Sequence, residues 1–99
     1  MFIAMNRFKV RRGSEDEFER VWKERDTHLT GVPGFIEFHL LRGAAADGYT
    51  LFASHTVWAS FGAFEAWTNS EAFRAAHSSA GQHRHLYADR PHFEGFEVV

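Results

Sequence analysis

The chain has 99 residues, of which 16% are aromatic, with a formal net charge of −2 and no cysteine. This length allows one hydrophobic core, so we expect a single domain over residues 1–99. The balanced charge disfavours nucleic-acid and anionic-membrane binding. The lack of cysteine excludes disulfides, thiol catalysis and cysteine-ligated metals. With no long apolar segment in the sequence, we expect a cytoplasmic protein.

The first half of the chain predicts a strand, a helix and a hairpin. Residues 2–10 are apolar on both faces for half of their length, which is typical of a central strand. Ser14 and Glu17 form a capping box that begins a helix, expected to end near Thr27. The inward face of this helix carries residues at helical spacing, namely Phe18, Val21, Trp22 and Arg25. Two strand-rich segments, residues 35–42 and 49–58, are joined by residues 43–48.

The second half predicts two short helices and a last strand. Ser60 and Ser70 are each expected to cap a helix, with a break at Asn69 and Ser70 between the two. Residues 78–90 are polar and rich in Gly, His and Arg, which predicts an irregular loop. Residues 93–99 are expected to form the last strand.

The order β-α-β-β-α-α-β is that of the ferredoxin-like α+β fold, in which helices cover one face of an antiparallel sheet. The other face would carry Met1, Ile3 and Met5. Since so large an apolar face is unfavourable in water, we expect it to pack on a second copy of the chain. The expected assembly is a homodimer of the dimeric α+β barrel type.

Three residues stand out as candidates for chemistry, and each has a purely structural alternative. Asn6 lies mid-strand on the helix-covered face, where a buried amide needs a partner, which a helix end or loop could supply. Taken singly, Trp67 is better explained as a core residue. His77 is better explained as a helix residue that is exposed or bonded to a neighbour. If the helix break bends the chain, Trp67 and His77 could line one cavity.

The segment 64–77, residues 56–58 and the strand around Asn6 resemble the antibiotic-biosynthesis-monooxygenase superfamily, over about residues 1–80. Within it, the trio Asn6, Trp67 and His77 resembles the haem-degrading monooxygenases of the IsdG type in order and spacing. Many quinol-oxidising relatives have a histidine where this chain has Trp67.

This resemblance implies that haem is both substrate and cofactor. His77 would be the axial ligand of the haem iron, Asn6 would donate its amide N–H to oxygen on the opposite side, and Trp67 would press on the porphyrin and distort it. The ring would be opened with dioxygen and electrons from an external reductase. Iron would be released, with biliverdin or a related product. Arg84 is the first candidate for binding the haem propionates.

Two other functions stay open. The same cavity could serve cofactor-independent oxygenation of a quinol or polyketide phenol, with His77 as base. The chain could also be a non-catalytic dimer that binds haem or another planar ligand. Outside the trio, a metal site at His83, His85 and His92 is less well supported than a solvated loop. The remaining histidines, His28, His39 and His55, are assigned structural or exposed positions. Trp22 and Trp58 are assigned to the core.

Overall fold

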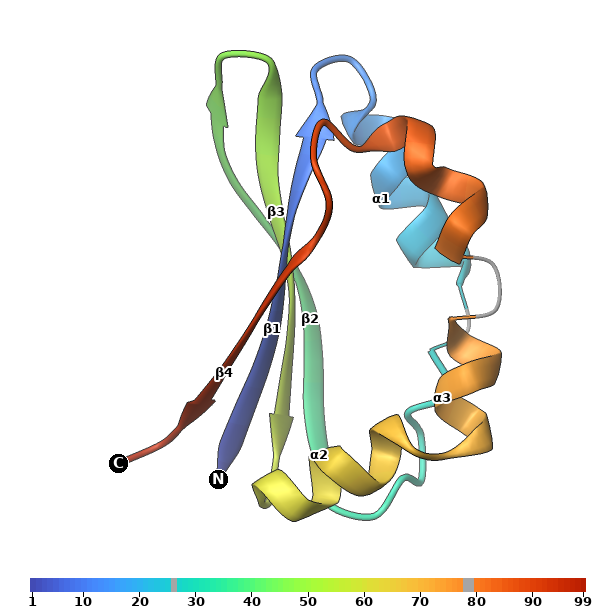
Figure 1. The fold of residues 1–99 in the computed structure, drawn as a ribbon, viewed down its shortest axis with the longest axis vertical. Coiled ribbons are helices and arrows are strands. Elements are labelled where there is room, and N and C mark those ends of the chain that lie inside the picture. Colours follow the sequence, from blue (N-terminus) through green and yellow to red (C-terminus); the bar gives the residue numbers. More distant parts are fainter. Residues whose placement is uncertain (26, 78–79) are drawn as a thin grey trace.

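The computed structural model describes residues 1–25, 27–77 and 80–99. Its elements follow the order β1 (Phe2–Arg11), α1 (Glu15–Glu24), β2 (Phe35–Ala46), β3 (Tyr49–Trp58), α2 (Phe61–Thr68), α3 (Glu71–Ala76), a 3₁₀ segment η1 (Ala80–Leu86) and β4 (His92–Glu97). Within the described residues, four strands form one antiparallel sheet in the order β2-β3-β1-β4. The helices lie on one side of this sheet (Figure 1). The predicted ferredoxin-like α+β fold is confirmed.

Strand β1 is central, as its apolar sequence predicts. It pairs with β3 along its whole length and with β4 over Phe2–Arg7. Alternate side chains of β1 are buried toward the helices, namely Phe2, Ala4, Phe8 and Val10. Asn6 has the same parity, and lies opposite Ser54 on β3 and Phe93 on β4. The backbone therefore places one amide side chain on the helix-covered face of the sheet.

Helix α1 begins and ends differently from the prediction. Ser14 makes no side-chain cap, and the predicted capping box is wrong. At the start of this helix the carboxylate of Glu15 instead accepts hydrogen bonds from the Gly13 N–H and the Thr50 hydroxyl, both at 2.7 Å. The helix ends at Glu24 rather than near Thr27, since Arg25 has extended backbone angles (φ −79°, ψ 133°).

The hairpin and the chain after α3 also depart from expectation. Strand β2 continues to Ala46 through a register irregularity, so the loop predicted over residues 43–48 shrinks to a turn at Asp47 and Gly48. Most of the predicted irregular loop is ordered: η1 ends on the fully buried Leu86, and Tyr87 pairs with Val10. Residues 78–79 lie outside the described part. Strand β4 spans 92–97 instead of 93–99.

The break between α2 and α3 is built by serine capping, as predicted. The Ser60 hydroxyl accepts from the N–H of Ala63, and the Ser70 hydroxyl accepts from the N–H of Phe73, both at 3.1 Å. Ser70 also donates to the carbonyl of Trp67 at 2.6 Å, which holds the end of α2 against the start of α3. None of the helices in the described residues has the length and apolar character needed to cross a membrane.

Candidate functional site

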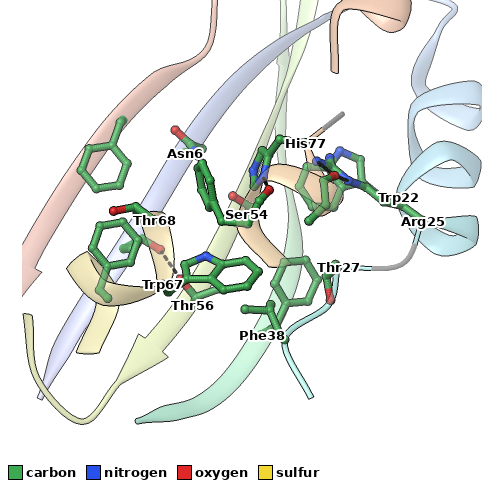
Figure 2. A pocket seen from close by; sticks show the side chains of 16 residues that line it. Asn6, Trp22, Arg25, Thr27, Phe38, Ser54, Thr56, Trp67, Thr68 and His77 are labelled. Carbon is green, nitrogen blue, oxygen red and sulfur yellow. Dashed lines mark hydrogen bonds between the residues drawn. The ribbon is translucent and has the colours of Figure 1, made fainter. Parts of the chain in front are cut away.

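A cavity of about 450 Å³ lies between the sheet and the surrounding helices (Figure 2). Its wall brings together Asn6 from β1, Trp67 from α2 and His77 directly after α3. Five aromatic side chains line the rest of the wall, together with a similar number of polar ones; the aromatic residues are Trp22, Phe38, Phe64, Phe73 and Phe93, and the polar ones Arg25, Thr27, Ser54, Thr56 and Thr68. A concave volume of this size that combines aromatic surfaces with convergent polar groups is typical of a small-molecule site. The sequence-predicted trio therefore does line one cavity.

Asn6 is half-buried on the floor of the cavity. No hydrogen bond joins its side chain to any residue that the structure describes. The structural alternative, a bond to a helix end or loop, is therefore not formed with a described residue. The N–H donors and the carbonyl acceptor of this amide are therefore available to a ligand in the cavity.

Trp67 belongs both to the core and to the cavity wall. It is 6% exposed and lies in the same apolar cluster as the fully buried Trp58. Its ring stacks on Trp58 with centroids 6.1 Å apart and meets the edge of Phe73 at 5.6 Å. These contacts hold the indole in one orientation, so the wall that it forms is rigid.

His77 is exposed as a residue, yet its ring is held by its own helix. Its Nδ1 lies 2.8 Å from the carbonyl oxygen of Phe73, and the Phe73 ring is 4.1 Å away between centroids. A carbonyl only accepts, so Nδ1 carries the proton in this bond, and no described residue bonds Nε2. Partial burial lowers the pKa of His77 below its ordinary value, and the charge of Arg25 acts in the same direction, whereas the bond to Phe73 opposes both. A neutral imidazole with a free Nε2 is the form that ligates metals.

Two cavity residues on α1 and its end were missed or misassigned. Trp22 was assigned to the core, but it is half-buried and lines the cavity, stacked on Phe38 with ring centroids 5.8 Å apart. The guanidinium of Arg25 lies over the Trp22 ring at 4.6 Å and also lines the cavity. A sequence signal for both existed: Arg25 is a charged residue on the otherwise apolar face of the predicted helix.

Arg84 lies outside this cavity, in a second hollow of about 850 Å³. The two share four lining residues, Asn6, Trp22, Arg25 and His77, so the second hollow continues the first. The alternative of a metal site at His83, His85 and His92, which the sequence favoured less than a solvated loop, gains no support: His85 lies 3.0 Å from a carboxylate oxygen of Glu17. Across the described residues, no cluster of three or more His, Asp or Glu side chains suits a metal ion.

The family model described as antibiotic biosynthesis monooxygenase matches residues 1–79. The chain belongs to this family. A "heme oxygenase (mycobilin-producing)" of Mycobacterium tuberculosis is 33% identical over 97 residues, which are 98% of this chain and 88% of that protein. The heme-degrader MhuD from Mycobacterium tuberculosis, solved with two hemes in its active site, is similar with a TM-score of 0.74 and 30% identity over 100% of this chain and 96% of that one. SnoaB of Streptomyces nogalater, a cofactor-independent oxygenase, is similar with a TM-score of 0.70 and 25% identity over 98% of this chain and 91% of that one.

The residues of this antibiotic biosynthesis monooxygenase fit a flat ligand with a metal centre. The indole and phenyl rings suit the faces of a planar ligand, and Nε2 of His77 is an available nitrogen of the kind that could ligate a metal. The hydrogen bond from Nδ1 to the Phe73 carbonyl is the outer contact that fixes a ligating imidazole. Haem therefore suits the residues that line the cavity.

Proposed function

We propose that this chain is a haem-degrading monooxygenase that binds haem in the cavity through Nε2 of His77. One observation carries the proposal: a tautomer-fixed imidazole and an unbonded amide share an aromatic cavity. The relatives support it, since one is named as a heme oxygenase and another as a heme-degrader with hemes bound in its active site.

Each residue of the trio has a distinct task in this proposal. Haem, when bound, supplies an iron centre that activates dioxygen with electrons from an external donor. The Phe73 carbonyl keeps the proton of His77 on Nδ1, so that Nε2 stays available as a ligand. The amide of Asn6 would offer an N–H donor where negative charge develops on the ligand. Trp67, fixed by Trp58 and Phe73, would be a rigid surface against the bound ring.

The charged ends of haem would lie toward the second hollow. Its propionates are anionic, and the hollow that continues the cavity is lined by Arg84 and Arg90. An arginine suits a carboxylate because two N–H groups can donate in parallel. We assign Arg84 to the propionates on this basis.

We also propose that two copies pack through the open sheet face. The helices leave this face bare (Figure 1). Ile3 and Met5 of β1 lie on it, with Phe96 of β4, which is 44% exposed. Sedimentation at micromolar concentration should give twice the chain mass for wild type and the chain mass for Met5→Lys. A wild-type monomer would exclude this assembly.

The main experiment is reconstitution with ferric haem. Wild type should give a Soret band of a histidine-ligated haem, and His77→Ala should lose that band while its circular dichroism stays unchanged. His85→Ala is the matched control, because the His85 side chain is 61% exposed, lies near Glu17 and does not line the cavity. Equal haem spectra for wild type and His77→Ala would exclude the proposed ligation.

Turnover is tested on the same complex with ascorbate or a reductase under air. We expect the Soret band to decay and a ferrous chelator to capture the iron. Mass spectrometry of the product then distinguishes a mycobilin, as the name of the relative suggests, from biliverdin. A Soret band that persists with no iron release would indicate a non-catalytic haem-binding protein.

A second function is favoured by the likeness to SnoaB, a cofactor-independent oxygenase. In this case the neutral His77 would take a proton from a phenol or quinol, and Asn6 would stabilise the resulting anion. Haem-free protein would then consume oxygen with such a substrate. Oxygen uptake without haem, abolished by His77→Ala, would replace the haem proposal with this one.

A further inference from the structure

Arg25 joins two parts of the chain that both contribute to the cavity. It directly follows α1, and both Nε and Nη2 of its guanidinium donate to the carbonyl oxygen of Ala76, at 3.0 and 2.6 Å. Ala76 is the last residue of α3 and is 5% exposed. The next residue is His77. The two bonds therefore link the end of α1 to the backbone that carries the imidazole (Figure 2).

The end of α3 depends on this contact. A helix leaves its last carbonyls without internal partners, and α3 has only the residues Glu71–Ala76. The carbonyl of Phe73 is taken by the backbone N–H and by Nδ1 of His77. For Ala76, in contrast, the donors are the two guanidinium nitrogens of Arg25. Without them, the carbonyl of a buried residue would lose charge-assisted bonds.

The guanidinium is itself held in place. It lies over the Trp22 ring at 4.6 Å, one turn earlier on the same side of the chain. Trp22 in turn stacks on Phe38 of β2. A planar guanidinium resting on an indole has a fixed orientation, whereas a lysine ammonium could offer the same carbonyl one donor without the stacking.

We propose that Arg25 is a positioning residue for His77. By holding the Ala76 carbonyl it fixes the C-terminal end of α3, and with it the direction in which the imidazole meets a ligand. This inference rests on the proposed haem ligation. It adds a residue that acts on His77 through the carbonyl of the preceding residue, Ala76, and not through the ligand.

The first test uses haem-free protein, so that its outcome does not depend on haem ligation. In Arg25→Met, hydrogen exchange at the His77 amide should become faster by about 10- to 100-fold, the range for loss of a hydrogen bond to a charged donor. Arg25→Lys should show a smaller increase, because one donor remains. Arg20→Met on the exposed side of α1 is the matched control and should exchange like wild type. Unchanged exchange in Arg25→Met would overturn the proposal.

The second test follows the ferric haem complex by electron paramagnetic resonance. Wild type and Arg20→Met should each show one histidine-ligated species. Arg25→Met should show a mixture of ligation species, and Arg25→Lys should show a mixture in which the wild-type species is more abundant. If Arg25→Met weakens haem binding but keeps the single species and the slow exchange, Arg25 contacts the ligand directly and the positioning role is wrong. If the resonance spectrum of the wild-type haem complex already matches that of His77→Ala, the haem proposal fails. The hydrogen-exchange data then still decide whether Arg25 holds the end of α3. Should Arg25→Met not fold, the same two measurements on Arg25→Lys decide.

Discussion

Substitution of Trp67 separates its role in the core from its role at the cavity. The indole is 6% exposed and lies between Trp58 and Phe73, with ring centroids at 6.1 and 5.6 Å. Trp67→Ala removes the whole buried ring and should cost about 3–5 kcal/mol of unfolding free energy. Trp67→Phe keeps most of the apolar area and should cost about 1–2 kcal/mol. Since 1 kcal/mol shifts the Tm of a domain this size by about 4–8 °C, the Ala variant should melt at least about 12 °C below wild type.

The assay for the core role is thermal unfolding of the haem-free variants, followed by far-UV circular dichroism. Trp22→Ala is the matched control, because Trp22 lines the same cavity but is only half-buried. We expect it to cost about 1–2 kcal/mol, well below the loss for Trp67→Ala. If Trp67→Ala melts within about 4 °C of wild type, Trp67 is not the core residue that its contacts indicate.

Trp67→Phe then tests the cavity role in a protein that stays folded. The smaller ring should still allow haem to bind, but it presses less on the porphyrin, so ring opening should slow while the Soret titration changes little. The decay of the Soret band with ascorbate under air measures this rate. Decay at the wild-type rate would leave Trp67 with a structural role alone.

Three further outcomes are expected. Asn6→Ala should melt close to wild type, because its side chain bonds no described residue, while haem ring opening slows by about 10² in single turnover; an unchanged rate would exclude the donor role. Gly34→Ala should melt well below Gly31→Ala: both positions have positive φ (+83° and +81°), but a Cβ at Gly34 would lie 2.4 Å from a Cβ of α2, whereas nothing lies within 4 Å at Gly31. The hydrogen bond from Thr50 holds the pKa of Glu15 below its ordinary value, and therefore the carboxylate stabilises the fold above about pH 4.3 and this contribution is lost as the pH falls. Acid unfolding of Glu15→Gln should accordingly depend less on pH below about 4.3 than that of wild type, and identical profiles would contradict this.

The fold could be predicted because its signals are local. Residues 2–10 predict a central strand because they are apolar on both faces for half of their length. The serines at positions 60 and 70 cap their helices as expected. The errors fell where a tertiary contact overrides a local rule. Ser14 makes no cap, and the contacts formed at this helix start are those of the Glu15 carboxylate with the Gly13 N–H and with the hydroxyl of Thr50 from β3. Leu86 and Tyr87 give structure to a polar segment because both pack on the sheet.

The site residues could be predicted only where they share one face of a strand or flank one break between helices. Asn6 follows from strand parity, and the turn at residues 69–70 brings Trp67 and His77 together. The contact from Arg25 to the Ala76 carbonyl spans 51 residues and involves a backbone oxygen, which no side-chain pattern reports. Trp22 was assigned to the core because the spacing of a helix tells which face is inward, and not whether that face meets side chains or an open cavity.

The cavity is a continuation of the core, which explains why each candidate had a structural alternative. Trp67 and Ala76 belong to the apolar cluster around Trp58 and also line the cavity. For an aromatic wall of this kind, folding and ligand binding select the same residue types, so the sequence does not separate the two roles. The polar atoms do. The amide of Asn6 and Nε2 of His77 bond no described residue, although both residues line the cavity, and the fold gains nothing from them there. Function is therefore best sought at these two polar groups, with the aromatic residues as the frame that holds a ligand between them.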